Sequence, residues 1–214
     1  MIPYATDLDL LHWEPNLLRD AAFASQTLIS GTGNLAGTSF TISSGSFTDA
    51  KAQIDQLVKL GPPFDGTYPI VAVNGATEIT LSVMYDGLFP ESGDRVPGPV
   101  GSASAVTYAI RTFYPQRAIV SELILQAAGL KPDQSLAVLN PLALRRPCAL
   151  GSLQMIYSAL AAAATDPAHF VVRADLYERL YRRALRSAQV ELDLDGDGVA
   201  ESRRALNVLE LRRA

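Results

Sequence analysis

The sequence predicts an α+β fold, with a helical bundle of about four helices, an inserted small β module and a C-terminal β-hairpin arm. Three observations predict this fold class. Apolar residues recur at helical spacing towards both ends of the chain, period-two alternation marks the middle, and an Asp-Gly turn follows the last helical stretch. We expect residues 1–27 and 113–189 to form the bundle, residues 28–112 the β module and residues 190–214 the arm.

The composition is that of a folded protein, since 48% of the 214 residues are hydrophobic and 19% are charged. No run approaches the roughly 20 apolar residues that cross a bilayer, and the N-terminus lacks the basic and apolar segments of a signal peptide. We therefore expect no membrane partner and residence in the cytoplasm. Cys148 is the only cysteine, so an intrachain disulfide is excluded, and we expect its thiol to be buried and unreactive.

Charge is distributed unevenly along the chain. Residues 1–114 carry eleven acidic and five basic side chains, a net charge of −6, whereas residues 115–214 carry eleven acidic and thirteen basic side chains, a net charge of +2. Fifteen of the eighteen basic residues are arginine, whose planar guanidinium suits carboxylate and phosphate pairing. This excess indicates either an acidic partner for the back half or only the base composition of the gene.

The pattern of residues 6–27 predicts that the chain begins with a helical segment, which is interrupted in the middle. Thr6 can cap a first turn, with Asp9 three residues later. Pro15 suits the start of a second helix, where its missing N–H costs no hydrogen bond.

The β module begins where glycine and threonine become frequent. Alternation over residues 38–42 predicts one strand, and residues 70–83 predict a hairpin. Asn74-Gly75 at its centre is typical of a type I′ turn, because both residues accept positive φ.

The rest of the module is less regular. Residues 50–60 predict a short helix across the sheet, because three apolar residues fall at helical spacing before Gly61. Residues 86–104 are rich in Gly, Pro and Ser and predict a long exposed loop, followed by a last strand near residues 105–110.

Three helices should follow. The first begins at Pro115 and ends before Gly129, and the second occupies residues 142–164. The third is expected at about residues 173–189, with three inward residues: Leu176, Leu180 and Ala184.

An acidic motif occupies the predicted turn of the arm. Its residues match positions one, three, five, six and nine of a calcium-binding loop: Asp193, Asp195, Asp197, Gly198 and Glu201. Position twelve is Arg204, where a bidentate Glu is required, so a high-affinity site is not expected. The motif then predicts either weak Ca²⁺ binding or a hairpin turn with solvated carboxylates. No other cofactor is expected.

Four arginines recur at spacings of three and four on the last helix: Arg179, Arg182, Arg183 and Arg186. They should line one exposed face. This face is either solvated, with Asp175 and Glu178 as local partners, or a contact surface for an acidic protein or for nucleic acid.

Equipment for catalysis is scarce. His12 and His169 are the only histidines, neither has metal-ligand spacing, and no Gly-x-Ser-x-Gly elbow occurs. We therefore expect a binding or assembly protein and not an enzyme.

Several short motifs occur in a characteristic order. They are Asp7-Leu8, Glu14-Pro15 and Gln26, then residues 68–71 and 77–80, then residues 111–116, and finally residues 176–183 and 192–198. In this order they resemble the head–tail connector family of tailed bacteriophages, whose members are also called adaptors or head-completion proteins.

The resemblance implies a virion structural protein of the neck, assembled in the host cytoplasm. It implies a homo-oligomeric ring of twelve subunits under the portal, which extends the DNA channel and can touch the DNA without reading its sequence. The partners would be the portal protein and the next head–tail or tail component. The alternatives are a tail or baseplate structural component, or a metal-dependent enzyme at the acidic hairpin.

The arm would dock on the portal or on a neighbouring subunit. We expect residues 190–195 and 203–211 to pair as a hairpin that adds to a strand of the partner. The predicted docking residues are Val190, Leu192, Leu194, Arg203, Arg204, Leu206, Val208 and Leu211.

Overall fold

The structure is a computed structural model that describes residues 2–89 and 92–206. The chain divides into two compact units. One unit is Glu14–Thr112, and the other combines Met1–Trp13 with Phe113–Ala214. The first unit is therefore inserted into the second.

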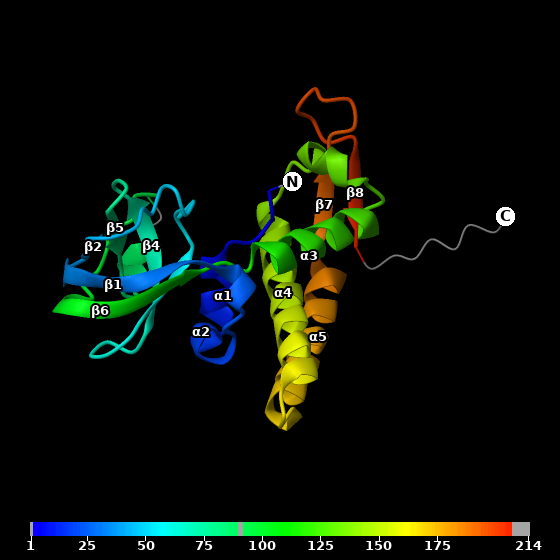
Figure 1. Ribbon diagram of the computed structural model, residues 1–214. Coiled ribbons are helices and arrows are strands. Elements are labelled where there is room, and N and C mark those ends of the chain that lie inside the picture. The colour runs from blue at the N-terminus through cyan, green and yellow to red at the C-terminus, as the bar shows by residue number, and fades with distance from the viewer. Residues whose placement is uncertain (1, 90–91, 207–214) are drawn as a thin grey trace. The chain divides into compact units, whose positions relative to one another are not determined.

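The inserted unit contains a closed antiparallel barrel (Figure 1). Its six strands are β1 (Thr27–Gly37), β2 (Ser39–Ile42), β3 (Leu57–Leu60), β4 (Thr67–Val73), β5 (Glu78–Leu81) and β6 (Gly101–Arg111). They follow the order β1-β2-β5-β4-β3-β6, and β6 pairs with β1 to close the barrel. The unit also contains three short helical segments: α2 (Leu17–Asp20), η1 (Ala24–Gln26) and η2 (Asp86–Leu88).

The barrel interior is filled by apolar side chains from all six strands. Phe40, Phe47 and Tyr108 form its aromatic centre, with the rings of Phe40 and Tyr108 edge to face at 5.1 Å between centroids. Such pairs contribute about 0.5–1.5 kcal/mol beyond their buried area. Burial raises the pKa of the Tyr108 phenol above its ordinary value.

The predicted fold class is wrong, because the middle of the chain is a complete barrel and not a small β module in a helical bundle. The molecule is α+β with a six-stranded antiparallel barrel, four main helices and a C-terminal β-hairpin. Strands β1 and β6 pair along almost their whole length, from Thr27 opposite Arg111 to Gly37 opposite Gly101. Both strands are partly exposed, so their alternation is too weak to predict their length.

The helix predicted over residues 50–60 is also wrong. Residues 57–60 form β3, which pairs with β4 and β6, while Ile54 is 55% exposed. The apolar spacing suited a helix, but Val58 and Leu60 are buried in the barrel core as parts of a strand that pairs with β4 and β6. Pairing with distant strands therefore decides this segment.

The hairpin predicted over residues 70–83 is confirmed as β4 and β5, but the predicted type of turn is wrong. The strands pair from Ile70 with Leu81 to Val73 with Ile79, and neither Asn74 nor Gly75 has positive φ. A four-residue loop replaces the type I′ turn. The Asn74 side chain holds this loop by donating to Glu78 Oε1 at 3.3 Å and to Thr80 Oγ1 at 3.0 Å.

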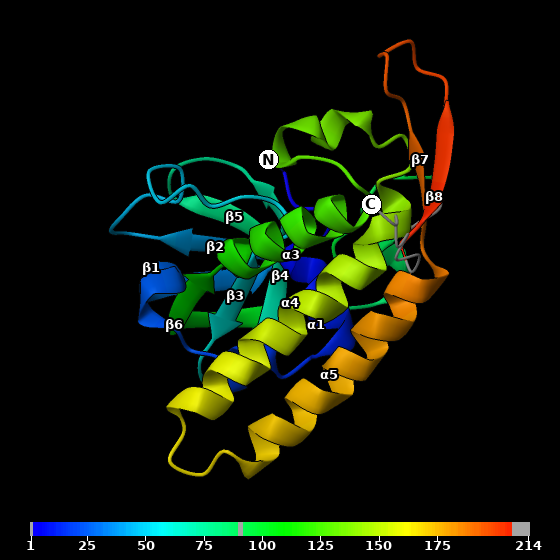
Figure 2. The ribbon, with the colours of Figure 1, turned by 90° about the vertical axis from the view of Figure 1, so that its right-hand side faces the viewer.

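The second unit is built on four main helices, α1 (Asp7–Trp13), α3 (Tyr114–Ala127), α4 (Leu142–Ala163) and α5 (Ala168–Ser187), with η3 (Pro132–Ala137) between α3 and α4. Helices α4 and α5 lie side by side (Figure 2). The hairpin β7 (Gln189–Leu192) and β8 (Ser202–Ala205) continues from α5. Among the described residues, no helix is both long and apolar enough to cross a membrane.

Helix α5 begins five residues before the predicted start at residue 173, and its inward face differs from the prediction. Leu176 is 44% exposed, whereas Tyr177 is buried. The ring of Tyr177 stacks on Tyr157 of α4, with 5.6 Å between centroids and 15° between planes. The aromatic contact therefore turns the helix so that Leu176 faces solvent.

Helix α1 begins with a confirmed capping motif. The Thr6 main-chain N–H donates to Asp9 Oδ2 at 2.7 Å, and the Asp9 N–H donates to Thr6 Oγ1 at 3.3 Å. Arg145 of α4 forms an ion pair with Asp9. The cap and the ion pair together hold the N-terminal segment on α4.

A buried ion pair ties α1 to α3. Arg117 Nε lies 2.9 Å from Asp7 Oδ1, and the same oxygen accepts a hydrogen bond from the Phe113 N–H at 2.9 Å. Arg117 also donates to the Ala5 carbonyl at 2.7 Å. Both charged residues are almost fully buried. The two segments of this unit are therefore joined by charge at the point where the barrel is inserted.

We predict that Asp7→Asn lowers the free energy of unfolding by about 3–5 kcal/mol, because it leaves Arg117 buried without its counterion. Denaturant unfolding of the full chain measures the change. The matched control is Glu178→Gln, which breaks the exposed pair with Arg182 and should cost no more than about 1 kcal/mol. Equal effects of the two substitutions would contradict the assignment.

Candidate interaction site at the C-terminal hairpin

The C-terminal hairpin starts one residue after α5 ends. Its register places Val190 opposite Arg204 and Glu191 opposite Arg203. Glu191 and Arg203 form a cross-strand ion pair, whereas Val190 is fully buried against its own unit. The hairpin therefore has one face that stabilises the unit and one face that meets solvent.

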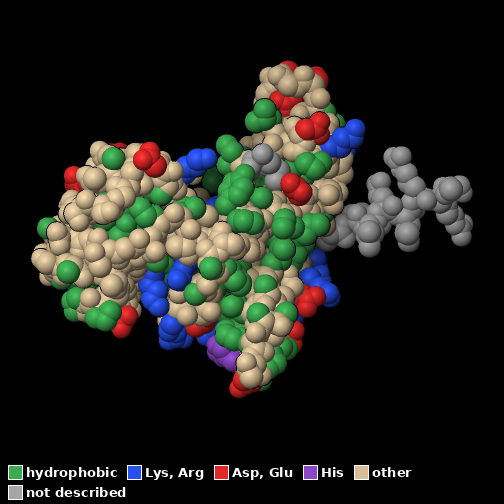
Figure 3. Space-filling view, viewed as in Figure 1, with side chains coloured by type: hydrophobic (Ala, Val, Ile, Leu, Met, Phe, Trp, Pro, Cys, Tyr) green, Lys and Arg blue, Asp and Glu red, His purple; other side chains and the backbone are tan. Residues whose placement is uncertain are grey.

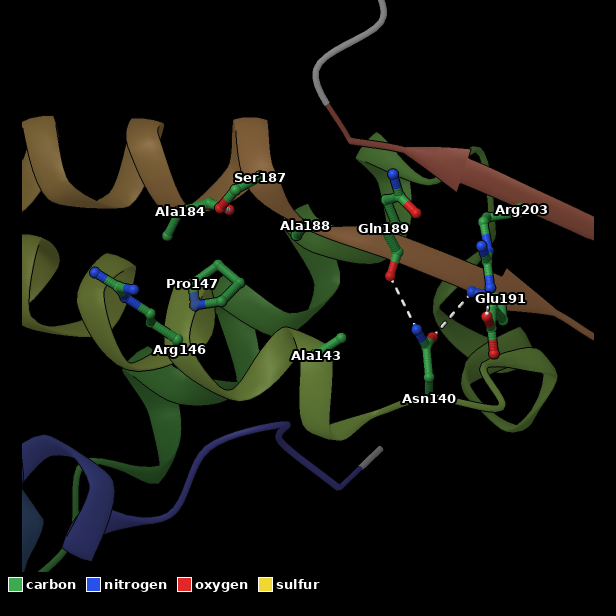
Figure 4. Close-up of a pocket in the computed structure, with 10 residues that line it drawn as sticks. All are labelled: Asn140, Ala143, Arg146, Pro147, Ala184, Ser187, Ala188, Gln189, Glu191 and Arg203. Carbon is green, nitrogen blue, oxygen red and sulfur yellow. Dashed lines mark hydrogen bonds and ion pairs between the residues drawn. The ribbon is translucent and has the colours of Figure 1, made fainter.

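One edge of the hairpin is closed by the segment that precedes α4. The Leu139 N–H donates to the Glu191 carbonyl at 2.9 Å. Asn140 then acts as a strand residue through its side chain, because Nδ2 donates to the Gln189 carbonyl and Oδ1 accepts from the Glu191 N–H, each at 2.9 Å (Figure 4). β7 is thus paired on both sides.

The opposite edge, formed by β8, is open among the described residues. The Leu206 N–H donates to the Ala188 carbonyl at 3.3 Å, so these two residues form a hydrogen-bonded pair. Antiparallel pairing alternates, so Arg204 also bonds to β7, while the main-chain groups of Arg203 and Ala205 point away from it. These groups can accept a further strand.

A hollow of about 340 Å³ lies at the root of the hairpin (Figure 4). Ala143 and Pro147 of α4 and Ala184 of α5 form an apolar wall, and Arg146 lies at one end with its guanidinium 5.2 Å from the Trp13 ring centroid. The other lining residues are Asn140, Ser187, Ala188, Gln189, Glu191 and Arg203. An apolar wall with a polar rim is typical of protein contact surfaces.

The acidic loop, residues 193–201, forms the tip of the hairpin, and Figure 3 shows acidic side chains gathered there. Its carboxylates accept main-chain hydrogen bonds within the loop. Asp193 accepts from the Gly196 N–H at 2.6 Å and from the Gly198 N–H at 2.8 Å, and Glu201 accepts from the Leu194 N–H at 2.5 Å. These bonds hold the loop through its own backbone.

The structure brings together the four predicted metal ligands. One carboxylate oxygen from each of Asp193, Asp195, Asp197 and Glu201 lies within 4.8 Å of the others. Hard oxygen ligands at this spacing suit Ca²⁺. Arg204, at the twelfth position, donates to the Ala128 carbonyl at 2.6 Å and adds no ligand.

The four arginines of α5 are all exposed. Arg182 lies 2.5 Å from Glu178 and is locally neutralised. In the described part of the chain, no carboxylate lies within ion-pair distance of Arg179, Arg183 or Arg186. These three guanidinium groups keep their positive charge available.

The predicted docking residues do not share one surface. Val190, Leu192 and Leu206 are buried, whereas Leu194 and Arg203 are exposed. Arg204 is half-buried, and Val208 and Leu211 lie outside the described residues. Sequence reasoning missed Asn140, because a lone Asn before a helix carries no signal of a strand-like side chain.

The side chains with catalytic potential lie apart from this site. Cys148 is buried in α4 with its Sγ 3.2 Å from Ser121 Oγ, and burial raises the pKa of its thiol. The thiol is therefore protonated at neutral pH and a poor nucleophile. The ring of His169 packs edge to face on the ring of Phe170, with 5.4 Å between the ring centroids.

No protein-family model, curated protein or solved structure matches this chain.

We predict that Asn140→Ala accelerates amide exchange at Glu191 by about five- to tenfold, because it removes the acceptor for that N–H. Hydrogen exchange followed by NMR resolves the residue. The matched control is Gln154→Ala, whose side chain donates an exposed hydrogen bond to Ser158 Oγ of α4 at 3.3 Å. Unchanged exchange at Glu191 would show that Asn140 does not hold β7.

For the acidic loop we predict that Ca²⁺ binds with a Kd of about 10⁻⁴ M or weaker, because the bidentate twelfth ligand is missing. Asp195→Asn should abolish the calorimetric signal without unfolding the loop, since an amide oxygen can still accept the 3.2 Å hydrogen bond from the Asp197 N–H. Submicromolar binding would contradict this expectation.

Proposed function

We propose that this protein is a non-enzymatic structural protein of a tailed-phage virion, which forms a ring under the portal and extends the DNA channel towards the tail. The open edge of β8 is the observation that carries the proposal. The order of the sequence motifs, with their resemblance to head–tail connectors, supplies the identity of the partner.

The open edge supports docking by strand addition. Arg203 and Ala205 direct main-chain donors and acceptors outward, and β7 is paired on its other side by Leu139 and Asn140. A partner strand can therefore add at β8 without displacing any strand within the described residues. The added strand would extend a two-stranded sheet that is already anchored to the helical unit.

The same geometry changes which residues perform the docking. Val190 and Leu192 are buried in their own unit, so they stabilise the arm and do not meet the portal. Removal of residues 190–214 would expose core side chains and is not a clean test. The proposed contact uses the backbone of β8 and the exposed side chain of Arg203.

Ala205→Pro tests the proposal at one atom. The substitution removes an outward N–H and leaves the β7–β8 hydrogen bonds in place, as proline is tolerated on an outer strand edge. We predict that portal binding falls by at least about tenfold, measured by co-sedimentation of the purified full-length protein with portal rings.

The matched control is Ala205→Val, which adds bulk at the same position and keeps the donor. It should bind the portal like the wild type. Equal binding by the Pro variant would exclude strand addition at β8. Binding to tail-tube protein in place of portal would identify the alternative, a tail or baseplate component.

A further inference from the structure

Helix α5 carries a mixed stripe on its solvent face. Val172 is 67% exposed and Leu176 is 44% exposed, and Arg179 and Arg183 continue the same line at spacings of three and four. The apolar half lies nearer the start of the helix and the basic half nearer its end. We call these four residues the α5 stripe.

The charge of the stripe is not neutralised locally. Four other arginines of this unit form ion pairs with a carboxylate: Arg117 with Asp7, Arg145 with Asp9, Arg182 with Glu178 and Arg203 with Glu191. Arg179 and Arg183 have none among the described residues, although Asp175 lies four positions before Arg179. An acidic group from another molecule could form ion pairs with them.

The acidic loop of the hairpin has the matching composition. Leu194 is 52% exposed and Val199 is 63% exposed, and between them lie the exposed carboxylates of Asp195 and Asp197. The loop thus offers apolar and acidic side chains next to each other. The α5 stripe offers apolar and basic ones.

The loop and the stripe cannot meet within one copy. The hairpin continues beyond the C-terminal end of α5, and the acidic loop lies at its far end (Figures 1 and 2). From Arg179 to Ser187 the helix rises roughly 12 Å, and β7 adds roughly 13 Å before Asp193. Only a second molecule can bring the two surfaces together.

We propose that the acidic loop of one copy docks on the α5 stripe of the next copy. Because the two surfaces differ, the contact is heterologous, and repetition of it closes a ring if the rotation permits. The inference rests on the proposed function in that it supplies the subunit interface of the proposed ring. It names the partner as a second copy of this chain.

A second copy fits the stripe better than DNA does. A phosphate backbone would use Arg179 and Arg183 but would leave Val172 and Leu176 exposed. The loop satisfies both halves of the stripe through charge and apolar contact. DNA binding by this face is therefore the competing outcome of the test.

The test is charge exchange between two variants. Arg179→Glu with Arg183→Glu should reduce self-association of the full chain by about tenfold or more, measured by sedimentation velocity at low salt. Asp195→Asn with Asp197→Asn should do the same, and it keeps the oxygens that accept the N–H groups of Asp197 and Val199. Association of the wild type should weaken as salt rises.

Mixing two charge-reversed variants is the decisive part of the experiment. Arg179→Glu/Arg183→Glu and Asp195→Lys/Asp197→Lys should each fail to associate alone and should associate when mixed, because each copy then meets the opposite charge. Arg182→Glu is the control, since it reverses one charge on α5 at an arginine that already has Glu178 as its partner. It should associate like the wild type.

Several outcomes would overturn the contact: a monomeric wild type, unchanged association of the Arg179→Glu/Arg183→Glu variant, an equal loss in Arg182→Glu, or a mixture that does not associate. Duplex DNA binding that needs Arg179 and Arg183, without self-association, would assign the face to DNA. Portal binding is measured in parallel. Self-association of the wild type without portal binding would contradict the proposed function and support the contact between copies. Portal binding by the wild type, together with unchanged self-association of the charge-reversal variants, would contradict only the contact between copies.

Discussion

The buried pairing of Asp7 with Arg117 is the constraint on which the helical unit depends. This unit is built from two stretches of chain that are separated by the whole barrel, so an ordinary loop cannot hold them together. A buried charge that loses its partner is far more costly than an exposed one, and the pairing therefore specifies which surface of α3 receives the N-terminal segment. The Phe113 N–H, bonded to the same carboxylate, places this constraint at the point where the chain returns from the barrel.

The hairpin extends the same unit by a different means. Val190 and Leu192 bury apolar surface, and Asn140 supplies the hydrogen bonds that a third strand would otherwise give to β7. Burying such side chains contributes about 1.5–3 kcal/mol each. β7, the strand nearest the helices, is thereby paired on both sides, and among the residues that the structure describes the outward main-chain groups of the hairpin lie on β8. An open edge on an anchored sheet can bind a partner without the ordering cost that a loose arm would carry.

Local signals in the sequence predicted the parts of the fold that local physics decides. Thr6 with Asp9, and Pro115 with Gly129, mark helix ends because capping and positive φ are short-range properties. The helix prediction for the segment around Leu57 failed because the conformation of this segment comes from pairing with β6, some fifty residues away. The site shows the same division: the acidic loop was visible as a motif, whereas Asn140 and the open edge of β8 follow from register, which a single sequence does not encode.

The separation of buried and exposed groups within the hairpin determines how it can recognise another molecule. If Val190 and Leu192 were free, the arm could stick to any apolar surface, and its choice of partner would depend on shape alone. Because they are buried, the proposed recognition depends on the direction of the main-chain groups of β8 and on the charges of the acidic loop. Both are directional or sign-dependent, so a wrong partner leaves donors or charges unsatisfied. The stability of the arm therefore comes from the buried side chains of β7, whereas its proposed selectivity comes from the open edge of β8 and from the acidic loop.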